Sequence, residues 1–520
     1  MRHWSFYFFA KLALFYSDRL NFHWRENLLL ALFLLWPLAP GRLQTVRAWL
    51  AWPLALGLLY YDSFLPSLER VLSQVSSLAN FRLDYLMELL GRVVDGRALL
   101  GGLAVFVLYL LLARRIRFTP LAFAGIFSVP ISAALLASPV ESVPVSVGAP
   151  VPGQEGGAAT AQTPDAQLQA FYANEAQRKL SFSLGGATPP FDIVVLQVCS
   201  LSWDDLEFVG LRDHPLLRRF DVVFTQFNSA ASYSGPAALR LTRGSCGQTS
   251  HQDLYEGVDP ACYLFPSLEQ LGYKVQGLLN HDGKFDEFAR MLEARAGMAG
   301  RLELPSNAPI AMRNFDGSPI FSDIALLRRW WQQRQSQGSQ PAALYYNTVS
   351  LHDGNHVEGI ASRSSLDTYK PRLSKLLADF DQFISELEST GRPVLLLLIP
   401  EHGAALRGDR FQISGMREIP NPRITLVPVG MKLIGMPGAG TGSTIVNNTP
   451  VSYYGVNALV LDLLRDSPLN AGSPSLEQRL QQLQATDFVS ENADVVMMRT
   501  PQGNYLMRSG KNSSWVNYVP

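Results

Sequence analysis

The stretch RPVLLLLIPEHG, residues 392–403, places a run of large apolar residues directly before a carboxylate and an imidazole. An apolar run without polar alternation is typical of a strand that is buried on both faces of a parallel sheet. Glu401 and His402 follow that strand, where packing gives no reason for a charged pair. In open α/β sheets, ligands bind beyond the carboxyl ends of the strands. The stretch therefore predicts both a fold class and the sheet edge that carries a site.

Strand patterns alternate with helical patterns on both sides of this stretch. The predicted strands lie at 191–198, 221–227, 273–279, 343–349, 392–399 and 424–434. The predicted helices lie at about 235–242, 265–271, 284–294, 320–334 and 367–389. This alternation is typical of a three-layer α/β (αβα) fold with a largely parallel sheet. We expect such a domain over residues 166–520, introduced by a short amphipathic helix at 166–180.

Side chains with metal-binding or catalytic chemistry follow several of these strands. They are Cys199, Ser234, His281, His352, Glu401 and His402. Taken alone, a cysteine is most often a small buried apolar residue, and a histidine such as His352 can be an ordinary loop residue. Together, a thiolate, a carboxylate and an imidazole are ligands that zinc prefers. The pattern predicts a zinc ion held by Cys199, Glu401 and His402.

The stretch FNSAASYSGPAALRLTRGSCGQ, residues 227–248, offers a fourth ligand. Ser234 precedes Gly235-Pro236, and a proline in the first turn followed by AALRL marks a helix start. Free N–H groups and the positive dipole end favour a phosphate there, and a metal lowers the pKa of a bound hydroxyl. Ser234 is therefore predicted to be both a ligand and a nucleophile. A metal pair of His352 and His356 is less favoured, because four ligands are already present elsewhere.

Long apolar runs dominate the first 137 residues. Four of them approach the roughly 20 residues that a membrane-spanning helix needs, at 26–40, 46–64, 98–113 and 119–137. A fifth run at 4–16 contains Lys11 and is soon followed by Arg19, so it either spans the bilayer or lies in the interface. We predict a transmembrane domain over residues 1–137 with about five helices.

Arginine placement predicts how these helices are oriented. Arginines gather at 113–118 and between the runs at Arg42 and Arg47, and loops rich in Lys and Arg stay cytoplasmic. The chain after about residue 138 is then expected outside the cytoplasm, with 64–97 as an outer loop. The segment 138–165 is rich in Pro, Gly and Ala and is predicted to be a flexible linker. The 44 basic and 44 acidic residues give no net field for nucleic acid.

Several motifs together resemble a known family. They are LQVCSLSWDD (196–205), FNSAASYSGPAALRLTRGSCGQTSH (227–251), LHDGNH (351–356), PEHGAALRGDR (400–410) and GMREIP (415–420). The chain is similar over nearly its whole length to the cellulose phosphoethanolamine transferases of Gram-negative cellulose secretion systems, in the alkaline phosphatase and sulfatase superfamily. The resemblance implies an inner-membrane anchor, a periplasmic alkaline phosphatase-like domain and one Zn²⁺. It also implies phosphatidylethanolamine as donor, cellulose as acceptor and the cellulose synthase complex as partner.

The resemblance also implies roles for individual residues. Cys199, Ser234, Glu401 and His402 match zinc ligands, and Ser234 matches the nucleophile that forms a phosphoserine ester before transfer to a glucose 6-hydroxyl. His352 matches a histidine near the transferred phosphate.

Four more residues match positions of the family. Arg417 matches a substrate-binding arginine. Tyr233, which is adjacent to the nucleophile, is expected to position the substrate. Cys246 and Cys262 match a disulfide. The superfamily's more usual aspartate ligand and threonine nucleophile are cysteine and serine in this chain, which favours the cellulose branch over the lipid A branch.

The acceptor is not stated by the residues themselves. The alternatives are a related membrane-anchored phosphoethanolamine or phosphoglycerol transferase that acts on lipid A or a glycan, and a phosphatase or sulfatase. A non-enzymatic scaffold is a further alternative, but it would not need the complete ligand and serine set. Trp330, Trp331 and Trp515 are candidates for a glucan platform and could equally be packed residues.

Overall fold

The computed structural model describes most of the chain. The described residues are 4–17, 20–63, 81–93, 96–136, 163–184, 191–305, 307–360, 362, 364–436, 442–510 and 513–519. They form two compact units, the first made of Met1–Gln74 and Leu89–Thr160 and the second of Val75–Glu88 and Ala161–Pro520. Most of the predicted linker at 138–165 and much of the predicted outer loop at 64–97 lie outside the described residues.

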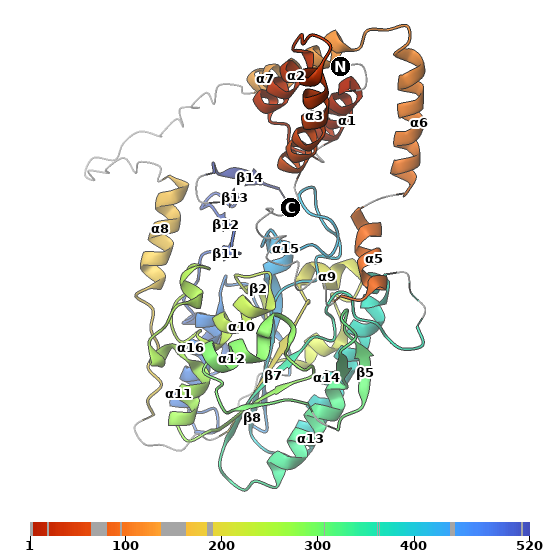
Figure 1. The fold of residues 1–520 in the computed structure, drawn as a ribbon. Coiled ribbons are helices and arrows are strands. Elements are labelled where there is room, and N and C mark those ends of the chain that lie inside the picture. The colour runs from red at the N-terminus through yellow and green to blue at the C-terminus, as the bar shows by residue number, and fades with distance from the viewer. Residues whose placement is uncertain are drawn as a thin grey trace, which may run out of the picture. The chain divides into compact units, whose positions relative to one another are not determined.

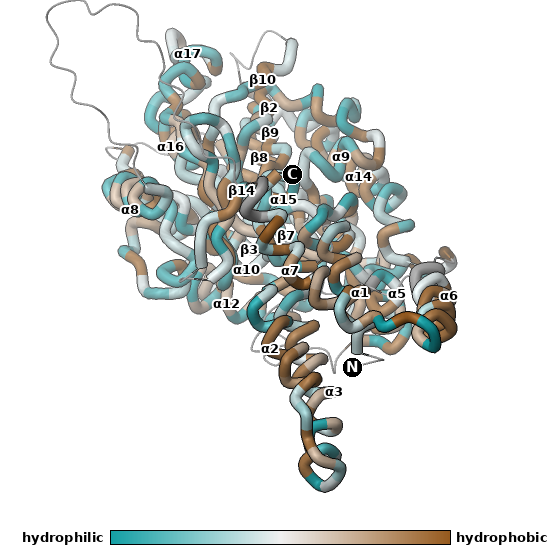
Figure 2. Tube along the Cα trace, turned by 90° about the horizontal axis from the view of Figure 1, so that it is seen from above, coloured by the Kyte–Doolittle hydropathy of each residue, from teal (hydrophilic) through white to brown (hydrophobic). Residues whose placement is uncertain are grey.

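Each predicted apolar run of the first unit forms a helix. These helices are α1 (Trp4–Tyr16), α2 (Trp24–Leu35), α3 (Arg42–Asp62), α6 (Gly96–Leu112) and α7 (Thr119–Leu136). Figure 2 shows hydrophobic residues along much of α2 and α6. Within the described residues, no helix has both the length and the hydropathy that crossing a membrane requires. A further helix, α5 (Leu83–Val93), falls in the predicted outer loop, and its residues are divided between the two units.

Lys11, the charge inside the first apolar run, is buried in the first unit. Its ammonium forms an ion pair with Asp62, and the two side chains are only 1% and 0% exposed. Asn27 joins them, because its Oδ1 accepts from Lys11 Nζ at 2.8 Å and its Nδ2 donates to Asp62 Oδ2 at 2.8 Å. A buried charge is tolerated when it is paired and hydrogen-bonded. Lys11 therefore links α1, α2 and α3.

An eight-stranded sheet forms the centre of the second unit (Figure 1). Its strands, in spatial order, are β10 (Ile445–Asn447), β2 (Val222–Asn228), β9 (Leu426–Ile434), β8 (Val394–Pro400), β1 (Asp192–Val198), β7 (Ala342–Thr348), β3 (Lys274–Leu279) and β4 (Leu302–Glu303). Neighbouring strands pair in parallel except at β9, which is antiparallel to both β2 and β8. The six predicted strands are present, and the sheet is largely parallel.

Helices cover both faces of this sheet. Side chains of β1 alternate between two cores, with Ile193 and Val195 in one and Val194 and Leu196 in the other, as the period of a strand requires. The first core is completed by α10 (Ser234–Thr242), α11 (Leu264–Gln270), α12 (Phe288–Arg295), α16 (Tyr453–Arg465) and α17 (Leu476–Gln481). The second core is completed by α9 (Trp203–Phe208), α13 (Asp323–Gln335) and α14 (Tyr369–Ser389). The three-layer arrangement is the predicted one.

The C-terminal part of the second unit has no counterpart among the predicted elements. It holds a separate antiparallel sheet of β11 (Val489–Glu491), β12 (Val495–Arg499), β13 (Tyr505–Ser509) and β14 (Val516–Tyr518). The predicted N-terminal helix at 166–180 is shorter and earlier, as α8 (Pro164–Glu175), and begins where the Thr163 hydroxyl accepts from the Ala166 N–H at 3.3 Å.

The two tryptophans of α13 cannot form the glucan platform considered above. Trp330 and Trp331 are only 4% and 2% exposed and belong to the second core. Trp330 Nε1 also donates to Gln276 Oε1 at 3.1 Å. Trp515 is partly exposed, and its Nε1 donates to Asp165 Oδ1 at 3.0 Å. Of the two alternatives, the packed one therefore holds for Trp330 and Trp331, which are buried in the second core and not at the surface.

Cys246 and Cys262 form a disulfide, which confirms the pair that the resemblance implies. The bond joins residues 16 apart in sequence, after α10 and just before α11. Cys199 is free and buried.

We expect the double variant Cys246→Ser/Cys262→Ser to lower the free energy of unfolding by about 3 kcal/mol, because the closed loop restricts the unfolded chain. The measurement is thermal or denaturant unfolding of the full-length protein, followed by a probe in the second unit. Wild-type protein treated with a reductant is the control and should show a similar loss. Unchanged unfolding, or alkylation of Cys246 in the oxidised protein, would contradict the prediction.

Candidate active site

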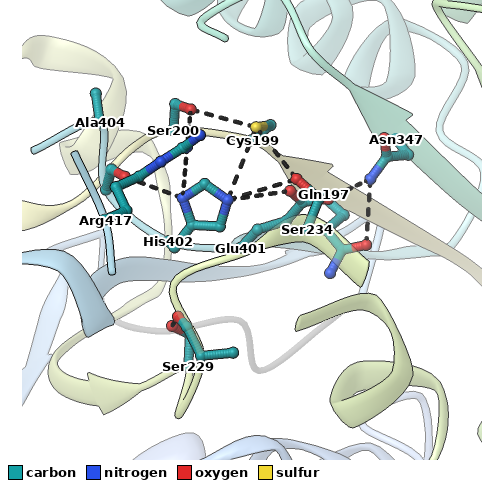
Figure 3. A network of polar contacts seen from close by, with 12 residues as sticks. Gln197, Cys199, Ser200, Ser229, Ser234, Asn347, Glu401, His402, Ala404 and Arg417 are labelled. Atoms are coloured by element: carbon teal, nitrogen blue, oxygen red, sulfur yellow. Dashed lines mark hydrogen bonds and ion pairs between the residues drawn. The ribbon is translucent and has the colours of Figure 1, made fainter. Parts of the chain in front are cut away.

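Three segments bring the predicted metal ligands to one edge of the sheet. Cys199 follows β1, and Glu401 and His402 follow β8, its hydrogen-bonded neighbour. The Glu401 N–H donates to the Val198 carbonyl at 2.8 Å, so the ladder continues to the first ligand of each strand. Ser234 follows β2 and is the first residue of α10. Figure 3 shows the four side chains pointing toward one another.

The distances among the four side chains fit a tetrahedral ion. Cys199 Sγ lies 3.4 Å from Ser234 Oγ and 3.9 Å from His402 Nε2. His402 Nε2 lies 3.4 Å from Ser234 Oγ and 3.8 Å from Glu401 Oε2. Ligands about 2.0–2.3 Å from a tetrahedral zinc lie roughly 3.3–3.8 Å from one another. Among the described residues, Cys199, Glu401 and His402 are the one group of three or more Cys, His, Asp or Glu ligands close enough to share an ion.

Hydrogen bonds occupy one polar atom of His402 and one of Glu401, and they leave the other polar atom of each side chain for an ion. His402 Nδ1 lies 2.9 Å from the Gly403 carbonyl, so this nitrogen carries the proton and Nε2 keeps its lone pair. Glu401 Oε1 accepts from Asn347 Nδ2 at 2.6 Å. Glu401 Oε2 is buried and has no hydrogen-bond partner in the described part of the chain. A buried carboxylate oxygen needs a partner, and an ion at this position would be one.

Electrostatics point to the same conclusion. Burial, together with the nearby Glu401 carboxylate, raises the pKa of the Cys199 thiol to about 12. Burial also raises the pKa of Glu401 and lowers that of His402. Two buried groups that become anions are stabilised by a cation bound between them. A thiolate, a carboxylate, an imidazole and a hydroxyl together fit Zn²⁺.

A chain of hydrogen bonds through His281 and Asn347 orients Glu401. The Gly283 N–H donates to His281 Nδ1 at 3.2 Å, so His281 Nε2 carries the proton and donates to Asn347 Oδ1 at 3.2 Å. Burial lowers the pKa of His281, which keeps the ring neutral as this chain requires. The Asn347 amide is thereby fixed with its Nδ2 toward Glu401. His281, predicted from its place after a strand, is a supporting residue and not a ligand.

We expect Asn347→Ala to weaken zinc binding by about 10- to 100-fold, because groups that orient a ligand affect metal affinity to this extent. The measurement is competition for the metal with a chelator of known affinity. Asn457→Ala is the matched control, since Asn457 is also buried but lies in α16. Equal zinc affinity in Asn347→Ala and wild-type protein would show that this hydrogen bond does not orient the ligand.

The surroundings of Ser234 suit an attacked phosphate. Tyr233 is the N-cap residue of α10, and its side chain does not cap the helix, so the first backbone N–H groups remain available. Two residues close to the ligands take left-handed backbone conformations, Ser200 with φ 66° and Ala230 with φ 57°. Gly403 has no room for a side chain, because a Cβ there would lie 2.6 Å from Ser202 Oγ. These positions allow the loops after β1, β2 and β8 to meet.

Arg417 reaches the ligands from the loop between β8 and β9. Its Nη1 donates to Ser200 Oγ at 3.1 Å and lies 3.3 Å from His402 Nδ1. Its guanidinium carbon also lies 5.7 Å from the centre of the Tyr233 ring. The positive charge is therefore beside the ligand cluster, where an anionic phosphate can bind.

His352 lies in the loop after β7, close enough to Arg417 and His402 for charge to act between them. Its Nδ1 lies 2.7 Å from the Asp353 carbonyl, which leaves Nε2 with a lone pair. The ring packs against Phe315, with centroids 5.3 Å apart. Burial, together with the positive charge of Arg417, lowers the pKa of His352 to about 4. The imidazole is therefore neutral near neutral pH and can accept a proton.

Polar contacts gather four of the predicted site residues, Cys199, Ser234, Glu401 and His402, and Arg417 Nη1 lies beside them, 3.3 Å from His402 Nδ1. His356 is not among the described residues that could share an ion with this group, and its backbone pairs with Arg313. One residue near His352 has no sequence signal. Tyr85, from α5, donates its hydroxyl to Asp353 Oδ2 at 3.2 Å, and it belongs to the second unit although it lies far from Asp353 in the sequence.

Comparisons with known proteins cover both units. A model of the "Cellulose biosynthesis protein BcsG N-terminal domain" matches residues 4–131, and one of the "Cellulose biosynthesis protein BcsG C-terminal domain" matches residues 151–515. Cellulose biosynthesis protein BcsG of Escherichia coli (strain K12) is 38% identical over 99% of this chain and 96% of its own length. The Salmonella typhimurium protein of the same name is 36% identical over the same shares.

Among solved structures, a protein in the alkaline phosphatase superfamily from Vibrio parahaemolyticus aligns over 68% of this chain and 88% of its own, with 14% identity and a TM-score of 0.48. The two family models and the full-length relatives leave one assignment, and this chain belongs to the cellulose biosynthesis protein BcsG family.

Proposed function

We propose that this protein transfers phosphoethanolamine from phosphatidylethanolamine to the glucose 6-hydroxyl of nascent cellulose, through a covalent ester on Ser234. The observation that carries the proposal is the convergence of Cys199, Glu401 and His402 on a serine hydroxyl at a helix N-terminus. Such a set serves phosphoryl chemistry, because it can activate the serine and hold an anionic group beside it. The name of the family supports cellulose as the acceptor.

Cys199, Glu401, His402 and Ser234 would hold the ion. Zn²⁺, when bound, would supply Lewis-acid polarisation of the serine hydroxyl and of the phosphoryl group. In the first step, Ser234 Oγ forms a bond to phosphorus while the bond to the diacylglycerol oxygen breaks. The proton lost by the serine hydroxyl balances the one that diacylglycerol gains. Arg417 and the N–H groups at the start of α10 stabilise the negative charge that develops on the phosphoryl oxygens.

His352 serves the second step. The 6-hydroxyl of a glucose unit attacks the phosphoserine ester, and its proton passes to a base while Ser234 Oγ leaves and regains one. A neutral imidazole with a free Nε2 suits the acceptance of that proton, and the contact of Nδ1 with the Asp353 carbonyl supports this tautomer. The same tautomer disfavours His352 as the acid that protonates diacylglycerol.

The proposed location of the protein follows from the proposed lipid donor. A lipid donor keeps the site near a bilayer, so we infer that the first unit anchors the protein in the bacterial inner membrane and that the second unit works in the periplasm. The arginines at 113–118 and at Arg42 and Arg47 support this orientation. The cellulose synthase complex is the partner that would supply the nascent chain.

The test is mass spectrometry of cellulose made by cells with and without this protein. Phosphoethanolamine on the glucose units is expected only with the protein present. Unmodified cellulose together with released phosphoethanolamine would identify water as the acceptor and a phosphatase as the function. Unmodified cellulose together with phosphoethanolamine on lipid A or another glycan would identify a related transferase.

A further inference from the structure

Arg417 and Glu418 are neighbours with opposite charges, and their backbone is fixed beside the nucleophile. The Ser232 hydroxyl donates to the Arg417 carbonyl at 2.5 Å. Asn492 Nδ2 donates to the carbonyls of Arg417 and Glu418 at 3.1 and 2.8 Å. Ser232 and Asn492 are both buried. The two charged residues are therefore held in one position relative to the segment that ends at Ser234.

Their side chains point to different neighbours. Arg417 reaches the ligand cluster, where its Nη1 contacts Ser200 and His402. Glu418 instead accepts a hydrogen bond from the Tyr233 hydroxyl, with its Oε1 2.5 Å away. The Tyr233 ring thus has the Arg417 guanidinium near its face and the Glu418 carboxylate at its hydroxyl end. Positive charge therefore lies beside the ligand cluster, and negative charge lies at the hydroxyl end of Tyr233.

A phosphoethanolamine group has the complementary order of charges, a phosphate followed by an ammonium. We propose that Glu418 and Tyr233 form the subsite for that ammonium, while Arg417 binds the phosphate side. This inference rests on the function proposed above. An ammonium offers only donors, so it is matched by an ionised carboxylate and by the face of an aromatic ring. Glu418 is partly exposed and can be reached by a substrate.

The other carboxylate near the site is less suited to an incoming cation. Asp353 is buried, and its oxygens accept from Tyr85 Oη at 3.2 Å, from Ser365 Oγ at 2.6 Å and from the Gly354 N–H at 2.9 Å. These bonds hold the loop that carries His352. Glu401 is committed to the ligand cluster. Glu418 is therefore the carboxylate that determines selectivity for a cationic headgroup.

The experiment compares two soluble donors with the full-length protein in detergent. One is p-nitrophenyl phosphoethanolamine, and the other is p-nitrophenyl propyl phosphate, in which a methyl group replaces the ammonium. Release of nitrophenolate gives kcat and KM for each. Glu418→Gln is expected to lower kcat/KM for the first donor by roughly 10- to 100-fold, mainly through KM, since one charged hydrogen bond is lost. The second donor should be unaffected.

The matched control is Glu477→Gln, which removes an exposed carboxylate from α17 and should change neither donor. An equal loss with both donors, or no loss with either, would overturn the subsite. If Glu418→Gln does not fold, Glu418→Asp replaces it, and an undiminished preference for the ammonium donor then overturns the proposal. Wild-type protein that releases no nitrophenolate from the ammonium donor would instead contradict the proposed function itself.

Discussion

Ser234→Ala protein is expected to form no phosphoethanolamine ester and to leave cellulose unmodified at a normal yield of polymer. The substitution removes the atom that would bond to phosphorus, while Cys199, Glu401 and His402 stay in place. Removing a nucleophile of this kind lowers the rate by on the order of a thousandfold or more. The measurement is the intact mass of the protein after incubation with a phosphoethanolamine donor. Wild-type protein should gain one phosphoethanolamine group, mapped to Ser234.

Ser229→Ala is the control for this experiment. It removes a buried hydroxyl from the same segment, one that donates to the Ala231 carbonyl at 3.2 Å. This variant should form the ester as wild-type protein does. If Ser234→Ala protein still transferred phosphoethanolamine to glucan, the covalent route would be wrong, and a single direct displacement by the sugar hydroxyl would replace it.

The convergence of Cys199, Glu401 and His402 could be predicted from the sequence because these residues obey a local rule. Cys199 and Glu401 each come directly after a fully buried strand, and β1 and β8 are neighbours in the sheet. Parallel strands end at the same edge, so chemistry at their carboxyl ends converges. The start of α10 at Ser234 could be predicted for the same reason, since Pro236 marks a first turn. The disulfide, by contrast, came from the family resemblance and not from spacing.

The residues that support the site could not be predicted. Asn347 lies inside β7 and looks like any polar residue of a strand until its neighbour Glu401 is known. Tyr85 reaches Asp353 across more than half of the chain, and no periodicity in sequence reports such a contact. The strands β11 to β14 are too short to show alternation. Tertiary packing determines all of these features.

Zinc binding should depend on each ligand side chain. We expect about one zinc ion per full-length chain, and Cys199→Ala or His402→Ala should lose it. A structural or catalytic zinc needs at least three protein ligands, and each variant removes one of the three strongest donors. Burial that raises the pKa of Cys199 to about 12 means that this thiol ionises only when a cation takes the place of its proton.

The measurement is metal content after dialysis against a weak chelator. His214→Asn, on a 3₁₀ helix N-cap elsewhere in the second unit, is the control and should keep its zinc. Full zinc occupancy in both ligand variants would show that the ion binds elsewhere. Glu401 Oε2 would then be a buried oxygen without a hydrogen-bond partner among the described residues.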